Sequence, residues 1–366
     1  MKILHINSYY SGSKFYKNLY DKQIKSGIDI DVFVPVPSTY KSDGFDYGEY
    51  TKICKNHNKY DRYIFHLKHN KIYNDIKKRY NIEDYSMVHA HSLFSNGYIA
   101  MKLKEEYGVP YIVAVRNTDV NVFFDKMIQL RKLGIQILEN ADKVIFISKP
   151  YKNHTISKFI PKEIKKDIDN KSVIIPNGVD DFWLKNKPNK KKHIEKNKIK
   201  LIYVGRVDSN KNIETTIKAC KLLIGQGYEV SYKIVGQIKE EKYRGITDQY
   251  SFIEYMPHCN REELIQHYRQ ADIFVMPSKY ETFGLVYLEA MSQGLPIIYT
   301  KGQGFDEWFK EGEIGYSVRY NSEKDVAYNI QNILYDYENI SKKCTKKIYK
   351  FNWGKINNDT MNIYSC

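Results

Sequence analysis

Two glutamates separated by seven residues form the pattern with the clearest potential for chemistry. Glu281 and Glu289 lie in the segment PSKYETFGLVYLEAMSQGLPI at residues 277–297. We expect Glu281 in the loop after a strand at 272–278 and Glu289 inside a helix at 285–293. A carboxylate in such a loop can accept hydrogen bonds from sugar hydroxyls, and one deeper in the helix can accept from both hydroxyls of a ribose.

The start of the same helix offers backbone donors. The amides of Phe283, Gly284 and Leu285 have no acceptor within the helix and lie at the positive end of its dipole, so they can bind an anion or a polar sugar group. Gly284 also permits a close approach of the backbone to a ligand. The alternative interpretation is that Glu281 only stabilises the helix N-terminus, while Glu289 is a solvated helix residue.

Two cations follow the first strand expected in the second half of the chain. Arg206 lies at the end of this strand, and Lys211 lies in the next loop, before a helix that Asn210 or Asn212 would cap. Two cations beside a helix N-terminus can neutralise the charge that develops on a leaving diphosphate. The alternative is that both are surface residues of a turn.

With these two motifs the chain resembles the family-4 glycosyltransferases, which are retaining enzymes of the GT-B fold. The E-x7-E element of that family corresponds to Glu281 and Glu289, and its paired Arg and Lys correspond to Arg206 and Lys211. Three further segments match the family: IPNGVD at 175–180, the turn Val235-Gly236, and FNW at 351–353.

The resemblance implies a metal-independent transfer with retention at the anomeric carbon. It places Glu281 near the donor sugar, Glu289 on the ribose, and Arg206 with Lys211 on the diphosphate. It also places Gly236 in the turn on the nucleotide side. The catalytic residues implied are therefore Glu281, Arg206 and Lys211.

The first half of the chain departs from the family at two places. The glycine-rich loop near the N-terminus, which would contact the donor phosphates, keeps only Gly12 between two serines. Where the family commonly has a histidine, after a strand at 110–116, this chain has Arg116. Arginine stays protonated and cannot act as a general base, but it could hold a phosphate or carboxylate with two hydrogen bonds. The alternative is a structural ion pair between Arg116 and Asp119.

Two histidines end the strand expected at 86–92. Strand alternation places His89 and His91 on one face, where we expect His91 to point into a cleft and His89 to pack inside. No third residue has metal-ligand spacing, so neither a metal nor another cofactor is expected. His91, Arg116 and Asp119 are thus the candidates for the acceptor side.

Short apolar runs alternate with helical segments along the whole chain, which is typical of parallel sheets with covered faces. We predict an α/β protein with two Rossmann-like domains that face a cleft and a C-terminal helix that crosses back to the first domain. The predicted boundaries are 1–180 for the acceptor-side domain, 181–198 for the linker, 199–345 for the nucleotide-sugar domain and 346–366 for the returning helix. The strands expected besides those at 86–92, 110–116 and 272–278 are 2–9, 29–36, 61–67, 143–148, 199–207, 229–236, 251–256 and 296–300, with a long helix at 123–141.

The 366 residues carry a formal net charge of +15. Such a charge can attract an anionic membrane or nucleic acid, but a general abundance of lysine explains it equally well, and no nucleic-acid recognition motif is present. No stretch is apolar enough to span a bilayer, and the five cysteines show no metal-ligand spacing. We therefore expect a cytoplasmic enzyme with reduced thiols and possible peripheral contact with the inner face of the membrane.

The expected substrates are a nucleotide sugar, in particular a UDP-activated hexose or N-acetylhexosamine, and a saccharide or lipid-linked acceptor of polysaccharide or glycolipid synthesis. Three alternatives belong to other classes of protein. A non-catalytic GT-B-like subunit or chaperone would not need the intact Glu and Arg/Lys motifs. A nucleic-acid-binding protein would need salt-dependent duplex binding. A nicotinamide-dependent dehydrogenase is disfavoured because no G-x-G-x-x-G follows either first strand.

Overall fold

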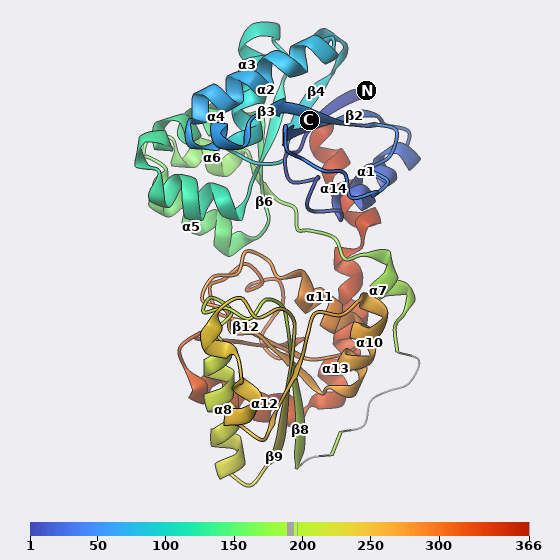
Figure 1. Cartoon of the computed structure of the whole chain (residues 1–366), viewed down its shortest axis with the longest axis vertical. Helices are drawn as coiled ribbons and strands as arrows, with labels where there is room; N and C mark the ends of the chain where they lie inside the picture. The colour runs from blue at the N-terminus through green and yellow to red at the C-terminus, as the bar shows by residue number, and fades with distance from the viewer. Residues whose placement is uncertain (189–193, 196, 366) are drawn as a thin grey trace. The chain divides into compact units, whose positions relative to one another are not determined.

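The computed structural model describes residues 1–188, 194–195 and 197–365, and the chain divides into two compact units (Figure 1). Unit 1 comprises Met1–Pro176 together with Trp353–Cys366, and unit 2 comprises Asn177–Asn352. The first boundary thus lies before residue 180, and helix α7 (Asp181–Lys185), which falls in the predicted linker 181–198, belongs to unit 2. The remainder of that predicted linker includes residues 189–193 and 196, which lie outside the described residues.

Unit 1 is built on a seven-stranded sheet with the order β3-β2-β1-β4-β5-β6-β7. All neighbouring strands are parallel, so each connection must cross over the sheet, and helices cover both faces. This burial on two sides explains the continuous apolar runs, such as YIVAV in β5, where every residue is buried. The strands are β1 (Lys2–Ile6), β2 (Asp29–Pro37), β3 (Thr51–His57), β4 (Met87–Ala90), β5 (Tyr111–Val115), β6 (Lys143–Phe146) and β7 (Ser172–Ile174).

The predicted strand at 61–67 is wrong, and strand β3 was not predicted. Residues 61–67 belong to the 3-10 helix η1 (Lys59–Tyr63) and to the start of α2 (Phe65–Arg79). The buried positions of α2, His69, Ile72 and Ile76, recur at helical spacing. Strand β3 lies at an edge and pairs only with β2, so its sequence TKICKNH stays mostly polar and lacks the apolar run expected of a central strand.

The predicted helix at 123–141 is interrupted. Its region contains the end of the π-helix η3 (Asp119–Phe124), the 3-10 helix η4 (Ile128–Leu130) and α4 (Arg131–Asn140). The other α-helices of unit 1 are α1 (Tyr16–Lys25), α3 (Ser95–Tyr107), α5 (Lys149–Phe159), α6 (Lys165–Asn170) and α14 (Trp353–Tyr364).

Helix α14 belongs to unit 1 although it follows unit 2 in the sequence (Figure 1). It packs against α1, and Gln23 Nε2 of α1 donates a hydrogen bond of 3.1 Å to the Tyr364 hydroxyl. Trp353, Ile356 and Ile363 are buried on the same side of the sheet as Ile3 and Val32. The prediction that a C-terminal helix returns to the first domain is therefore confirmed.

Unit 2 is built on a six-stranded parallel sheet with the order β10-β9-β8-β11-β12-β13. The strands are β8 (Lys198–Val204), β9 (Glu229–Val235), β10 (Ile253–Met256), β11 (Ile273–Val275), β12 (Ile297–Thr300) and β13 (Gly315–Val318). Besides α7, its helices are α8 (Ile213–Gly225), α9 (Ile246–Gln249), α10 (Arg261–Gln270), α11 (Leu285–Ser292), α12 (Glu323–Tyr335) and α13 (Tyr337–Lys347). The predicted class, two Rossmann-like parallel sheets in tandem, is confirmed.

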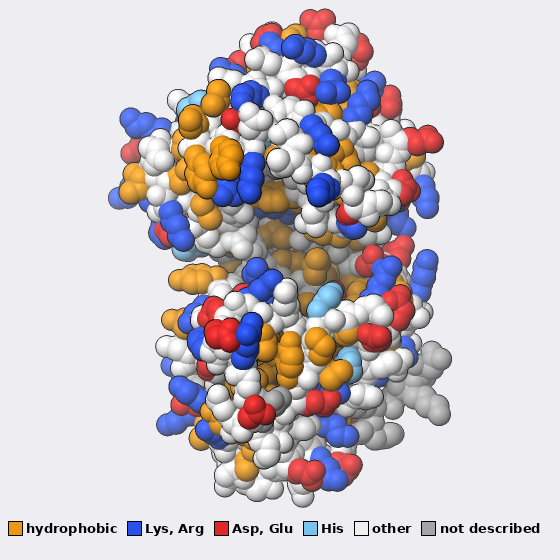
Figure 2. Space-filling model, in the orientation of Figure 1, with side chains coloured by type: hydrophobic (Ala, Val, Ile, Leu, Met, Phe, Trp, Pro, Cys, Tyr) orange, Lys and Arg blue, Asp and Glu red, His pale blue; other side chains and the backbone are white. Residues whose placement is uncertain are grey.

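The basic side chains are spread over the visible face of both units rather than gathered in one field (Figure 2). Among the described residues no helix is both long enough and apolar enough to cross a bilayer.

Candidate functional site

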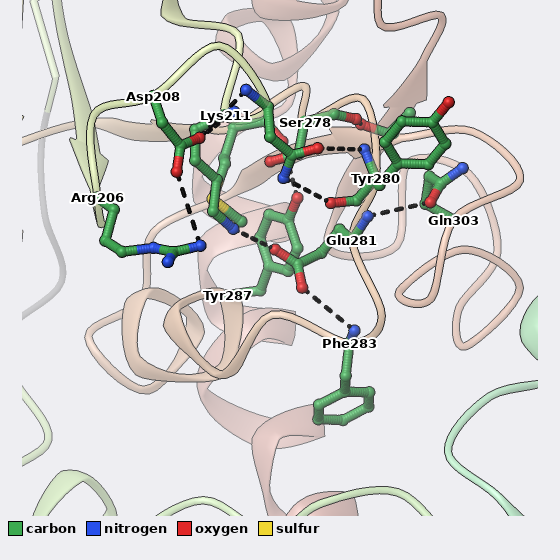
Figure 3. Close-up of polar contacts among 12 residues, drawn as sticks. Arg206, Asp208, Lys211, Ser278, Tyr280, Glu281, Phe283, Tyr287 and Gln303 are labelled. Carbon is green, nitrogen blue, oxygen red and sulfur yellow. Dashed lines mark hydrogen bonds and ion pairs between the residues drawn. The ribbon is translucent and has the colours of Figure 1, made fainter. Parts of the chain in front are cut away.

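The candidate site of unit 2 lies where β8 and β11 end next to each other in the middle of the sheet. Strand β8 continues the sheet through β9 on one side, and β11 continues it through β12 on the other. Ligands of open parallel sheets bind where the strand order changes direction in this way. Two loops follow these strands, the Arg–Lys loop at 205–212 and the glutamate loop at 277–284 (Figure 3).

Asn210 joins the two loops through its backbone and side chain. Its Nδ2 donates to the Tyr280 carbonyl at 3.0 Å, and its Oδ1 accepts from the Tyr280 amide at 3.1 Å. The Lys279 amide donates to the Asn210 carbonyl at 2.8 Å. Asn210 therefore fixes the spacing of the loops that carry Lys211 and Glu281, a role that was not predicted from the sequence.

Lys211 and Glu281 form an ion pair, with 2.6 Å between Lys211 Nζ and Glu281 Oε2 (Figure 3). The two side chains are only 16 % and 13 % exposed. An ammonium group has three donors, so Lys211 could bind a phosphate oxygen while it still holds Glu281. The structure thus brings together two predicted site residues that lie 70 positions apart.

Arg206 lies beside this pair with a largely free surface. Its side chain is 65 % exposed, and its Nη2 lies 3.6 Å from Asp208 Oδ2. Asp208 Oδ1 also accepts hydrogen bonds from the amides of Asn210 and Lys211, at 3.1 and 3.0 Å. Asp208 shapes the turn, and the Arg206 guanidinium stays accessible to an anion.

Gly284 directly precedes α11 and has a left-handed backbone conformation, with a φ of +78°. A Cβ atom at this position would lie 2.5 Å from the Tyr287 ring. The Phe283 amide donates to Glu281 Oε1 at 3.4 Å, so it is already engaged, as the alternative interpretation of Glu281 requires. Within the described part of the chain no acceptor is found for the amides of Gly284 and Leu285, which leaves them to a ligand.

A third loop, after β12, supports the glutamate loop from behind. The Glu281 amide donates to Gln303 Oε1 at 3.0 Å, and the Gly304 amide donates to the Glu281 carbonyl at 2.8 Å. A Cβ atom on Gly304 would lie 1.6 Å from the Thr282 carbonyl oxygen. Gln303 and Gly304 were not predicted as site residues, although neighbouring parallel strands end at one edge and the segment KGQG follows β12 directly.

Glu289 lies in the second turn of α11 and is half-buried. Its Oε2 accepts a hydrogen bond of 3.1 Å from the hydroxyl of Tyr268 on α10. Burial raises the pKa of Glu289 to about 7, against the Tyr268 hydrogen bond, which lowers it. Glu289 is therefore not a fully solvated helix residue, because its side chain is half-buried and bonded to Tyr268.

Gly236 brings two loops into backbone contact. Its φ is +145°, and a Cβ atom here would lie 1.9 Å from the Gly205 carbonyl oxygen. Gly236 therefore allows the turn after β9 to pack on the start of the Arg–Lys loop. Gly12 of unit 1 has no such constraint, since a Cβ atom would meet only the Tyr9 carbonyl oxygen, at 3.9 Å.

Asp119 of unit 1 is 1 % exposed and accepts three backbone hydrogen bonds. The donors are the amides of Leu93, Phe94 and Arg116, at 3.0, 3.0 and 2.8 Å. Burial raises the pKa of Asp119 to about 6, although these amides lower it. Arg116 Nε donates to the His91 carbonyl at 3.3 Å, and its guanidinium lies 6.0 Å from the centre of the Tyr16 ring. Asp119 is thus an interior residue that orders the loop from which Arg116 extends.

His91 is also an interior residue, 1 % exposed, rather than a side chain that points into a cleft. His89 and His91 stack on one face of β4 as predicted, with ring centres 4.2 Å apart. Spacing along the sequence offered no third ligand for this pair, but His5 of β1 pairs in register with His89 and lies beside both rings. His5 Nδ1 and His91 Nε2 are 2.9 Å apart, and His89 Nδ1 is 2.6 Å from the Tyr364 hydroxyl.

These three residues, here called the histidine cluster, offer ligand atoms within 4.8 Å of one another, which is a geometry that could hold a metal ion. Burial lowers the pKa of His5 to about 3 and also lowers the pKa values of His89 and His91. The rings are therefore neutral at ordinary pH, as metal ligands must be. Their spacing in the sequence could not reveal this arrangement, but the parallel pairing of β1 with β4 could.

Two family profiles match the chain. The profile described as Glycosyltransferase Family 4 matches residues 12–181, and the profile described as Glycosyl transferases group 1 matches residues 185–351. An uncharacterized glycosyltransferase of Methanocaldococcus jannaschii is 24 % identical over an alignment of 307 residues that covers 77 % of this chain and 76 % of that protein. The capsular polysaccharide biosynthesis glycosyltransferase CapM of Staphylococcus aureus is 27 % identical over an alignment of 208 residues that covers 54 % of this chain and 53 % of CapM.

Solved structures with the same two-unit fold cover the whole chain. Sucrose-phosphate synthase from Thermosynechococcus elongatus superimposes with a TM-score of 0.77 at 20 % identity, covering 100 % of this chain and 98 % of that one. HepE from Anabaena, solved with UDP, superimposes with a TM-score of 0.71 at 14 % identity and full coverage of both chains, 100 % each. HepE was also solved with UDP-glucose.

Proposed function

The chain belongs to the family-4 glycosyltransferases and uses a nucleotide sugar, and on that premise we propose that the donor is a UDP-activated hexose or N-acetylhexosamine. The proposed acceptor is a saccharide or a lipid-linked sugar. The observation that carries the proposal is the contact between Lys211 and Glu281, with Arg206 beside it, at the point where the sheet order of unit 2 changes direction. The UDP and UDP-glucose complexes of HepE support a uridine donor, and the name of CapM supports a role in polysaccharide synthesis.

In the proposed donor complex the diphosphate lies between Arg206 and Lys211. Negative charge grows on the diphosphate as its bond to the anomeric carbon breaks, so these cations stabilise the transition state more than the ground state. The amides of Gly284 and Leu285 at the start of α11 add two donors near the same group. Glu281 accepts from a hydroxyl of the transferred sugar.

Glu289 binds the ribose in this proposal. It follows the start of α11 by about one turn, roughly 6 Å along the helix axis, so the two glutamates can contact different parts of one nucleotide sugar. The acceptor proton passes to an oxygen of the leaving phosphate on the face where the new bond forms. No side chain is assigned as a covalent nucleophile, and no metal is assigned to the reaction.

The proposed contribution of unit 1 is Arg116, which would hold a phosphate or carboxylate of the donor or acceptor. Asp119 and His91 act through it, because the Asp119 carboxylate accepts from its amide and the His91 carbonyl accepts from its Nε. These two are positioning residues. In this proposal the backbone at Gly12 approaches the donor phosphates closely.

A ligand screen followed by product analysis tests the proposal. UDP at about 100 times its Kd should raise the melting temperature by roughly 5–10 °C, since a ligand that binds only the native state stabilises it. GDP and ADP should shift it less. The anomeric configuration of the product, measured by NMR with the preferred UDP-sugar, should equal that of the donor. An inverted product, or binding of UDP without consumption of any UDP-sugar, would contradict a retaining transferase, and the second result would favour the non-catalytic subunit.

A further inference from the structure

Unit 1 exposes a group of large apolar side chains on two neighbouring segments. The segments are 59–68, which contains η1 and the start of α2, and 122–132, which contains η4 and the start of α4. Each residue of this group is between 39 % and 75 % exposed. The group, here called the apolar cluster, consists of Tyr60, Tyr63, Ile64, Leu67, Val122 and Ile128.

Aromatic contacts beneath the surface hold the two segments together. The rings of Phe65 and Phe123 meet edge to face with centres 6.0 Å apart, and Phe65 also contacts Tyr98 at 5.5 Å. Phe123 stacks on the buried Phe94 at 4.6 Å. Each segment thus already has apolar residues that pack inside, so the exposed members of the cluster are additional to those that the fold needs. Single exposed apolar residues are common, but a group on adjoining segments indicates an interaction surface.

The charges carried by the two segments themselves are predominantly positive. Segments 59–68 and 122–132 hold six Lys and Arg residues and two aspartates. Both aspartates are paired with lysines outside the segments, Asp61 with Lys71 at 2.7 Å and Asp125 with Lys158 at 2.8 Å. Figure 2 shows hydrophobic side chains gathered beside Lys and Arg side chains on this side of unit 1. The exposed cations are Lys59, Arg62, Lys126 and Lys132.

We propose that the apolar cluster docks unit 1 on an anionic lipid bilayer. Tyrosine prefers the boundary between lipid and water, where its ring is in the apolar layer and its hydroxyl is hydrated. Ile64, Leu67 and Ile128 would enter the outer acyl region, and the surrounding cations would lie at the level of the anionic headgroups. A second copy of the chain fits less well, because two such surfaces would bring like charges together.

The docking would bring the enzyme to an acceptor that is confined to the membrane. This functional benefit depends on the lipid-linked acceptor of the proposed function. The docking itself does not depend on the donor. Each surface cation contributes to attraction by an anionic bilayer, whereas the apolar side chains contribute equally on neutral and anionic lipid. The two kinds of residue can therefore be separated by lipid composition.

Flotation of the whole protein with vesicles tests the inference. Phosphatidylcholine vesicles with and without phosphatidylglycerol are compared at low and physiological salt. We expect binding to the anionic vesicles that is at least tenfold stronger than to neutral ones and that weakens with salt. The double variant Ile64→Ser/Ile128→Ser should reduce partitioning about tenfold or more, and Lys59→Gln/Arg62→Gln should reduce it roughly 30-fold on anionic vesicles only.

Tyr335→Ser is the matched control, because Tyr335 is 96 % exposed on α12 of unit 2 and lies outside the apolar cluster. It should bind vesicles as the unchanged protein does. No binding at low salt, equal binding to neutral and anionic vesicles, or an equal loss in the control would overturn the inference. The inference would also be overturned if sedimentation without lipid showed a dimer of the unchanged protein that the Ile64→Ser/Ile128→Ser variant does not form. UDP binding, measured on the same samples, reports on the proposed function separately, so either can fail alone.

Discussion

The ion pair between Lys211 and Glu281 leads to a prediction that separates the roles of the two residues. In the ligand-free chain the Lys211 ammonium is 2.6 Å from the Glu281 carboxylate. A bound diphosphate would add a second anionic partner to the same ammonium. Glu281 and the diphosphate therefore compete, in part, for Lys211, and removal of the charge of Glu281 should not weaken the binding of a sugar-free nucleotide diphosphate.

The magnitudes follow from the geometry. Lys211→Ala removes a charge-assisted hydrogen bond that contributes about 1.5–3 kcal/mol, so the Kd for UDP should rise roughly 10- to 150-fold. The same change leaves Glu281, 13 % exposed, without its cation. Loss of one partner from a fully buried pair destabilises by about 3–5 kcal/mol, and we expect about 1–3 kcal/mol here because both side chains keep some contact with water. Glu281→Gln should leave the Kd for UDP unchanged or lower it up to about tenfold, while turnover falls by a factor on the order of 100.

Calorimetry with UDP and with uridine, combined with steady-state turnover, measures these effects. Uridine has no phosphate, so its affinity should be the same in Lys211→Ala and in the unchanged protein. Lys218→Ala is the matched control, since Lys218 is an exposed lysine of α8, the helix that directly follows the Arg–Lys loop. If Glu281→Gln weakens UDP binding as strongly as Lys211→Ala does, the carboxylate holds the nucleotide and does not compete with it, and the reasoning above is refuted.

Three further predictions concern the other parts of the site. Because the pKa of Glu289 is raised to about 7 and a ribose hydroxyl bonds best to an ionised carboxylate, UDP affinity should rise up to about tenfold from pH 6 to pH 8. Glu289→Gln should weaken the binding of UDP and of UDP-sugar to the same extent and should lose most of this pH dependence. If the pH dependence of UDP affinity is the same in Glu289→Gln, the ribose contact is contradicted. Gly304→Ala should lower turnover at least tenfold, because its Cβ atom would displace the Thr282 carbonyl behind Glu281, whereas Gly225→Ala, with open space around its Cβ atom, should be near neutral in the same assay. Turnover should be unchanged in excess chelator. A loss of activity that Zn²⁺ or Mg²⁺ restores would contradict metal-independent catalysis and make the histidine cluster the first metal site to test.

The sequence was sufficient for the features that repeat along the chain or that match a known motif. Apolar runs at regular intervals predicted most strands of both sheets, and the E-x7-E segment predicted α11 and its glycine. Strand β3 was not predicted because an edge strand needs few apolar residues, and residues 61–67 were misassigned because Tyr63, Ile64 and Phe65 form an apolar run within a helical region.

Contacts between distant segments could not be read from spacing. The pair Lys211–Glu281, the bridge made by Asn210 and the support by Gln303 all join loops that follow different strands. The strand order of the sheet brings these loops together, and this order follows from topology rather than from local pattern. His5 escaped notice for the same reason, since only the pairing of β1 with β4 places it beside His89.

Helix α14 makes unit 1 a discontinuous domain, and this has a consequence for how the protein is made. The ribosome synthesises residues 353–364 only after the whole of unit 2. The surface that Tyr364 covers beside Gln23 and His89 is therefore uncovered while unit 2 folds. Unit 2, which is one continuous stretch of chain, has no such delay. A nascent chain stalled before Trp353 would therefore expose the apolar residues of unit 1 that pack against α14 to chaperones or to other nascent chains. In a complete chain, closure of α14 onto α1 is the step that finishes the domain made first.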